Sequence, residues 1–170
     1  LAKNYEQVAI MLDTDFSETE NHRMNLFVYR DLVNWQTISQ WCLKATEKLD
    51  PVAQVVALEA LCLLKAGDIP GANRKIDDAM AQAPKEARVL AAYGLILYDM
   101  GVFDKLNVIS DKALENNAGN VLRQPLRLRA RYCRHKQDMA CEKKFLQLLL
   151  EKEPDSLLAL AGLAQIEFEQ

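Results

Sequence analysis

Glycine and proline are scarce in this chain, with six and five occurrences in 170 residues, so long disordered linkers are not expected. Half of the residues are apolar, but no apolar run approaches the ~18 residues that a membrane-spanning helix needs. The first residues, LAKNYEQ, lack the basic start and apolar stretch of a signal peptide. We therefore expect no transmembrane segment, and the compartment stays open between a bacterial periplasm and a cytoplasm.

Catalytic and metal-binding signatures are also missing. Only two histidines occur, His22 and His135, and there is no GxSxG, HExxH, Walker-type glycine loop or Cys-x-x-Cys pair. The sequence therefore predicts no catalytic residues, no cofactor and no metal site. A net charge of -3, and the presence of only one aromatic residue, Tyr132, among the arginines, argue against nucleic acid as a partner.

What the chain does contain is a repeat with a period of 34 residues. Small residues recur at this spacing and prolines punctuate the same frame: Ala45, Ala79 and Ala113; Ala60 and Gly94; Gly67 and Gly101; Ala130 and Ala164; Pro51, Pro84 and Pro154. A fixed period of this length is typical of a solenoid built from stacked supersecondary units. Such a protein works through an extended surface rather than a catalytic cleft.

Each period holds two helical patterns separated by a turn. In residues 53–84 the first pattern ends at Gly67, Asp68 is placed to cap the next helix, and Pro70 fits the first turn of that helix. Ile76 and Ala79 then share one face of the second pattern. Over the whole chain we expect about nine or ten antiparallel helices and no sheet.

This pattern resembles the tetratricopeptide repeat (TPR), a helix-turn-helix unit of 34 residues. The small residues of one unit are Ala60, Ala72 and Ala79, while the next unit departs from the pattern at Leu106 and Ser110. The resemblance implies an all-α, right-handed α-solenoid in a single TPR-like domain. Its expected units are a partial unit at 1–16, repeats at 17–51, 52–85 and 86–120, a divergent repeat at 121–154, and a terminal helix at 155–170, in which Ala164 is the small residue.

The resemblance also implies a peptide-binding groove lined by the first helix of each unit. Its positions correspond to Arg23, Phe27, Arg30, Gln54, Leu61, Lys65, Arg88, Leu95, Tyr98, Arg127, Arg131 and Arg134. Family members that hold a C-terminal carboxylate use a set of Lys and Asn, whereas this chain has Phe27 and Leu61 where that set has Asn. The implied groove has an apolar floor and arginines along its sides, which suits a segment with apolar anchors and acidic flanks.

A basic run stands out in the last full unit. Residues 123–136 carry six cations and no acid: Arg123, Arg127, Arg129, Arg131, Arg134 and Lys136. Four of the arginines follow helical spacing, so neighbouring like charges repel by a few tenths of a kcal/mol per pair. An acidic ligand would relieve this repulsion, and so would carboxylates from a neighbouring helix. Both explanations remain open, as does a solvated helix face.

The four cysteines fall into two kinds. Cys42 and Cys62 lie within helical patterns and are interpreted as small apolar core residues. Cys133 and Cys141 flank a predicted turn between antiparallel helices, where both a disulfide and two free thiols are compatible with the sequence. A metal site that adds His135 to these two cysteines is disfavoured, because the spacing fits no usual zinc pattern and a fourth ligand is missing.

Two functions follow from these observations. The first is a non-enzymatic scaffold or adaptor that binds a protein or peptide segment as part of a bacterial secretion or pilus assembly. If the arginines face this segment, we expect the segment to be acidic. The alternative is a regulatory or sensory region of a larger protein such as a transcription regulator.

Overall fold

The computed structural model describes residues 40, 43–44, 46–47, 50–120 and 122–169. Within these residues the chain forms seven complete α-helices, one short 3₁₀ turn and no strand. The elements are α3 (Ala53–Ala66), α4 (Ile69–Gln82), α5 (Ala87–Asp99), α6 (Phe103–Glu115), η1 (Ala118–Asn120), α7 (Gln124–His135), α8 (Met139–Lys152) and α9 (Leu157–Glu169). The expected all-α solenoid is confirmed, while the expected unit 1–16 and most of 17–51 lie outside the described residues.

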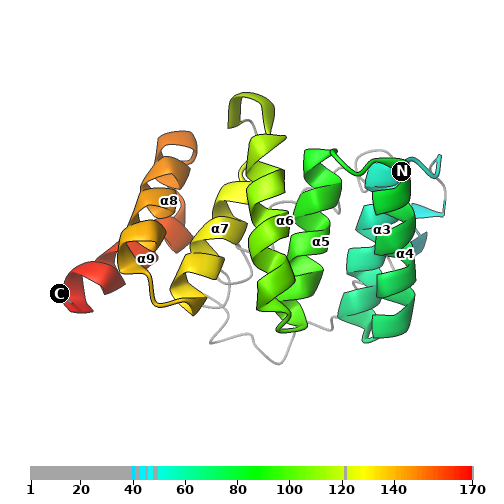
Figure 1. Cartoon of the computed structure of the whole chain (residues 1–170), viewed down its shortest axis with the longest axis horizontal. Coiled ribbons are helices and arrows are strands. Elements are labelled where there is room, and N and C mark those ends of the chain that lie inside the picture. The colour runs from blue at the N-terminus through cyan, green and yellow to red at the C-terminus, as the bar shows by residue number, and fades with distance from the viewer. Residues whose placement is uncertain (1–39, 41–42, 45, 48–49, 121, 170) are drawn as a thin grey trace.

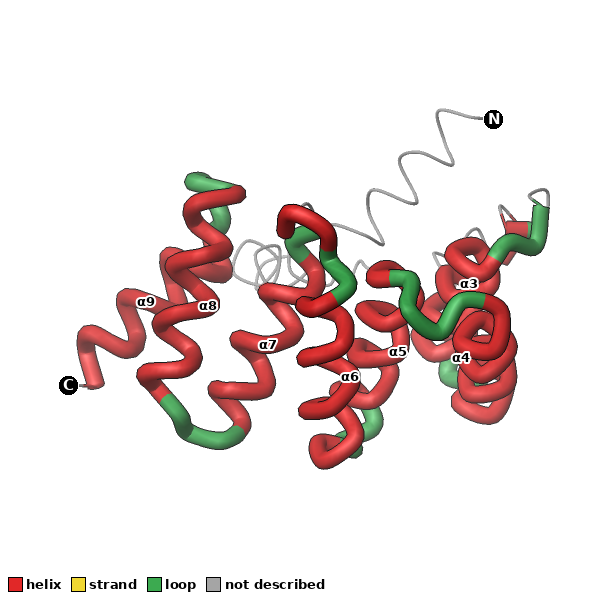
Figure 2. The backbone as a smooth tube through the Cα atoms, turned by 45° about the horizontal axis from the view of Figure 1, so that its top comes forward, coloured by secondary structure: helices red, strands yellow, loops and turns green. Residues whose placement is uncertain are grey.

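The helices form hairpins that stand side by side along the molecule (Figures 1 and 2). The pairs α3–α4, α5–α6 and α7–α8 pack within hairpins, and α9 packs on α8. The first helices of successive hairpins, α3, α5 and α7, also contact one another in order. We call the surface that these three helices share the first-helix face.

The three hairpin turns have the same backbone geometry. Gly67, Gly101 and Gln137 take positive φ values of 87°, 72° and 58°. In each turn the next residue donates its N–H to the carbonyl oxygen five positions earlier, at 2.9–3.0 Å, which satisfies a carbonyl left free by the helix end. Asp68 and Asp138 then cap α4 and α8 by accepting an N–H at 2.9 Å. The first two turns match the glycines of the sequence pattern.

Small side chains allow the helices to approach closely. Ala60, Ala72, Ala79 and Ala113 are all fully buried. A side chain added at Gly94 would overlap the side chain of Leu128 in the next hairpin, so α5 and α7 approach each other closely at this glycine. Ala164, expected as the small residue of the last unit, is instead exposed. The buried face of α9 runs through Gly162, because that face lies against α8, and no described helix covers Ala164.

The apolar core is divided into two clusters that both reach α7. The first contains buried residues of α3 to α6 together with Leu128 of α7. The second joins Ala130 of α7 to residues of α8 and α9. The first cluster supports the part of the first-helix face on which the candidate site lies.

Candidate functional site

A hollow lies on the first-helix face at the junction of α3, α5 and the start of α7. It contains about 310 Å³ of empty space, part of it open to solvent, and is lined by Leu61, Arg88, Ala91, Ala92, Leu95, Leu122 and Gln124. Leu61 and Leu95 are only 6% and 7% exposed, so they form an apolar floor anchored in the core. Three residues of the sequence-based groove, Leu61, Arg88 and Leu95, therefore come together here.

The wall formed by Leu122 is held by a side-chain clamp. Asn117 is 5% exposed, and its side-chain amide donates to the carbonyl oxygen of Leu122 at 2.8 Å. Its amide oxygen accepts the N–H of Leu122 at 3.0 Å. Both hydrogen-bonding groups of the Leu122 backbone are thus satisfied by one buried side chain, which fixes the approach of the chain to α7.

This wall belongs to an unusually long connection. The residues between α4 and α5 are 83–86 and those between α8 and α9 are 153–156, whereas those between α6 and α7 are 116–123. The longer connection contains the 3₁₀ turn and the Asn117 clamp. The sequence carries a signal for this longer connection, since Gly94 and Ala130 are 36 residues apart where the repeat has a period of 34. This signal does not show that the connection lines a hollow.

The rim of the hollow carries one exposed cation, Arg88, in the first turn of α5. No described residue forms an ion pair with its guanidinium. Gln54, another expected groove residue, is exposed on α3 but does not line the hollow. Lys65 is held by Asp99 at 2.7 Å, an ion pair that links equivalent positions of two successive units. Arg88 is consequently the cation that the hollow presents to a ligand.

An aromatic group lies further along α5. Tyr98 contacts the ring of Phe103 edge-on, with centroids 5.9 Å apart, and Phe103 stacks on His135 at the end of α7. The guanidinium carbon of Arg131 lies 5.4 Å from the centroid of Tyr98, within cation–π range. Tyr98 and Arg131 thus join α5 to α7, and neither lines the hollow.

Arg127 is not on an exposed surface. It is 3% exposed, and its guanidinium lies 2.5 Å from Glu153, which follows α8. Arg123 approaches the same carboxylate at 3.7 Å. Arg127 therefore serves the packing of the last hairpin and not a ligand-facing groove. The arginine-rich run itself contains no acid that could pair with Arg127. Glu153, which lies 26 residues further along the chain, supplies that carboxylate.

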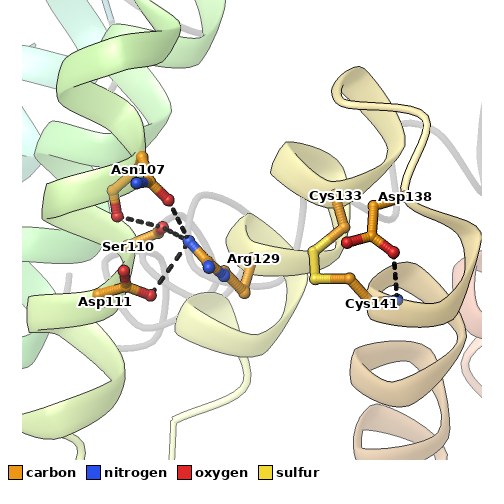
Figure 3. The surroundings of a disulfide bond; sticks show 7 residues. All are labelled: Asn107, Ser110, Asp111, Arg129, Cys133, Asp138 and Cys141. Carbon is orange, nitrogen blue, oxygen red and sulfur yellow. Dashed lines mark hydrogen bonds and ion pairs between the residues drawn. A yellow bond between two sulfur atoms is a disulfide. The ribbon is translucent and has the colours of Figure 1, made fainter.

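Two further arginines of α7 are also paired within the chain. Arg129 donates to Asn107 at 2.6 Å and to Ser110 at 3.2 Å, and it forms an ion pair with Asp111 at 3.0 Å (Figure 3). Arg134 forms an ion pair with Glu142 of α8 at 2.7 Å. Carboxylates of neighbouring helices, rather than an external ligand, balance these charges.

The turn between α7 and α8 is cross-linked. Cys133, which is 1% exposed, is joined to Cys141 by a disulfide with Cα atoms 5.6 Å apart, within the usual range for such bonds (Figure 3). Cys62 is fully buried, as its interpretation as a small apolar core residue predicts, but it is not a free thiol. It is also disulfide-bonded, and its partner lies outside the described residues. The helical pattern did not reveal the disulfide of Cys62, because a free thiol and a disulfide-bonded cysteine are equally compact and apolar in a helix core.

The remaining expected groove residues, Arg23, Phe27 and Arg30, lie outside the described residues, as does Cys42. In the part of the chain that the structure describes, no group of three or more His, Cys, Asp or Glu side chains is placed to hold a metal ion. None of the described helices is long and apolar enough to cross a membrane.

The fold and the hollow define a class of protein, an α-solenoid of TPR-like helical hairpins. No protein-family model matches the sequence, and no curated protein matches it. Among solved structures, the chain is similar to YrrB, described as a TPR protein with an unusual peptide-binding site. The two share 16% identity and a TM-score of 0.56, over 92% of this chain and 78% of YrrB. At this identity the similarity shows the fold alone.

Proposed function

We propose that this chain is a non-enzymatic protein-interaction module that holds a segment of another protein against its first-helix face. The observation that supports this proposal is the hollow, in which an apolar floor at Leu61 and Leu95 lies beside the exposed guanidinium of Arg88. Apolar anchors in a desolvated pocket supply most of the affinity of protein contacts, and rim charges supply orientation and on-rate.

Two further observations favour a protein partner. YrrB, which shares the fold, has a peptide-binding site. Arg127, Arg129 and Arg134 are paired with carboxylates of this chain, so they do not form an open basic stripe for phosphates. A protein or peptide segment therefore suits the described surface better than nucleic acid.

The biological setting has two candidates. We favour an adaptor in a larger assembly, such as a bacterial secretion or pilus system, because an extended surface without catalytic groups suits assembly. The alternative is the regulatory region of a larger polypeptide such as a transcription regulator. A DNA-binding domain in the same full-length polypeptide would favour the second setting, and a lipoprotein signal would favour the first.

The binding proposal is tested by selecting random peptides on the intact chain from a displayed library. We expect an enriched set whose binding is lost in Ala91→Gln, because the longer polar side chain fills the hollow. The matched control is Ala81→Gln, which makes the same change at an exposed position of α4 away from the hollow. Circular dichroism and the melting midpoint of each variant establish that the fold is retained.

The proposal is refuted if selected peptides bind Ala91→Gln and Ala81→Gln equally well while both variants stay folded. That outcome would move the interaction to another surface of the solenoid. Failure to enrich any peptide above background would also count against a module of this kind.

A further inference from the structure

We propose that the outer side of α9 is a self-association surface, through which two copies of the chain pair by laying their α9 helices antiparallel across a two-fold axis. Five exposed apolar residues define this surface, which we call the outer α9 face: Leu157, Leu160, Ala161, Ala164 and Phe168. It lies at one end of the row of hairpins and does not line the hollow (Figure 1). The inference therefore goes beyond the proposed function and is independent of it.

The helix α9 is apolar on two opposite sides. Ala159, Gly162 and Ile166 are buried on the side that packs against α8. Successive residues of an α-helix are rotated by about 100°, so the outer α9 face forms one stripe, roughly 100° wide, on the other side. A helix normally turns an apolar stripe of this width toward a core. Here the stripe is open to solvent, since Phe168 is 92% exposed and Leu160 is 45% exposed.

The preceding hairpins cover the equivalent side of their own first helices. Three residues occupy the position of Ala164 in those hairpins, and all three are buried: Ala60, Gly94 and Ala130. In each case the second helix of the hairpin packs on the first. α9 is the last element of the described residues, and none of them supplies it with a second helix. The outer α9 face is thus a helix-packing surface that the described part of the chain leaves uncovered.

The outer α9 face is complementary to itself in the antiparallel direction. Leu157 and Phe168 lie at its two ends, whereas Ala161 and Ala164 lie near its middle, and both pairs share one midpoint. A two-fold axis at this midpoint brings Leu157 of each copy level with Phe168 of the other, and Ala161 level with Ala164. The alanines let the two helix axes approach to the lower end of the usual ~8–10 Å, and the large side chains pack at both ends.

The charges of α9 also favour the antiparallel direction. A helix carries partial positive charge at its N-terminus and partial negative charge at its C-terminus. α9 has no acid in its first turn and no base in its last turn, and Glu167 is exposed near its C-terminal end. Within one copy, Glu167 lies at the end that disfavours an acid. In the antiparallel pair it comes level with Leu158, in the first turn of the other copy, where an acid is favourable.

The test begins with the oligomeric state of the full-length polypeptide. A stripe about 16 Å long on one helix is small beside the ~1,200–2,000 Å² of stable interfaces, so we expect a reversible dimer that dissociates on dilution. Sedimentation equilibrium over a range of protein concentrations, without reductant so that the disulfide of Cys133 and Cys141 is kept, gives the dissociation constant.

Charge variants assign the dimer to α9. Ala164→Glu should weaken dimerisation by at least about tenfold, because it sets two carboxylates about 4.5 Å apart along the axis in a contact that excludes water. The matched control Ala81→Glu, at an exposed alanine of α4, should leave the dissociation constant unchanged. Glu167→Lys should weaken the dimer about twofold or more, and Glu115→Lys, at an exposed acid that ends α6, should not. Circular dichroism establishes that each variant is folded.

Cross-linking tests the direction of the pair. Leu157→Cys and Phe168→Cys, prepared separately and then mixed, should be joined by a short bis-maleimide reagent, because the two positions come level. Leu157→Cys alone should not be joined, since its two copies lie about 16 Å apart along the axis of the antiparallel pair. The unaltered chain is the control for the native cysteines, none of which is a free thiol among the described residues.

Three results overturn the inference. A full-length polypeptide that stays monomeric at every concentration refutes the pairing, and it assigns the outer α9 face to another segment of that polypeptide or to a different protein. A dimer that survives Ala164→Glu in a folded chain associates through another surface. Efficient cross-linking of Leu157→Cys alone refutes the antiparallel direction. None of these results alters the proposed function, because library peptides that depend on Ala91 test the hollow separately.

Discussion

The buried ion pair between Arg127 and Glu153 gives the sharpest test of the structure. The Arg127 side chain is 4% exposed and that of Glu153 is 13% exposed. Removing one member of such a pair takes away an ion-pair partner at a poorly solvated position, which costs about 3–5 kcal/mol. Because Glu153 keeps some solvent access, we expect Glu153→Gln to destabilise the fold by about 3 kcal/mol. At ~2–4 °C per kcal/mol for a chain of this size, the melting midpoint should fall by roughly 6–12 °C.

A double-mutant cycle separates the pair from its surroundings. Arg127→Met should cost less than Glu153→Gln, because the Glu153 carboxylate keeps Arg123 at 3.7 Å. Replacing both residues by methionine should restore stability to within about 1 kcal/mol of the original, since no buried charge remains. Arg123→Gln is the control, because that side chain is 47% exposed and its contribution is about 0–1 kcal/mol.

The measurements are thermal and denaturant unfolding followed by circular dichroism, with the slope against denaturant compared among variants. If Glu153→Gln melts within about 1 °C of the unaltered chain, the pair is not buried as the structure has it. The same experiment decides the role of Arg127. A ligand-binding arginine would tolerate Arg127→Glu with an intact fold, whereas this structure predicts that the substitution disrupts the last hairpin.

Two further predictions concern packing and cross-linking. Gly94→Ala should destabilise by about 1–3 kcal/mol, because the new methyl group overlaps Leu128, and Leu128→Ala in the same chain should recover part of the loss; a melting midpoint unchanged by Gly94→Ala would contradict the close approach of α5 and α7. Cys133 and Cys141 should resist thiol labelling until reductant is added, and replacing both by alanine should cost about 2–3 kcal/mol; rapid labelling of the native chain without reductant would refute the bridge.

The helical hairpins could be predicted from sequence because their determinants are local. Gly67, Gly101 and Asp68 act within a few residues of their own positions, so their residue types alone indicate where helices end. Buried alanines at a fixed period indicate close helix contacts in the same way. Gln137 escaped this reasoning, because glutamine seldom adopts the positive φ of 58° that it has here.

The candidate site was predictable only in part. The resemblance to TPR units implied that Leu61, Arg88 and Leu95 line one groove, and the structure brings these three residues together. Spacing could not identify the partners of Arg127 or the clamp on Leu122, because those contacts join residues whose proximity depends on the packing of whole hairpins. A run of arginines without nearby acids in sequence is therefore weak evidence for an acidic ligand in a repeat protein.

The division of the core at α7 has a consequence for the elasticity of the solenoid. Leu128 belongs to one buried cluster and Ala130 to the other, and two positions on a helix are rotated by about 200°. The two clusters therefore press on nearly opposite sides of one helix and share no other helix. A change of curvature at α7 would leave the packing inside each cluster intact, because the two clusters meet only at that helix. Because Leu128 of α7 packs in the first cluster, the hollow between α5 and Gln124 at the start of α7 would keep its width in such a change.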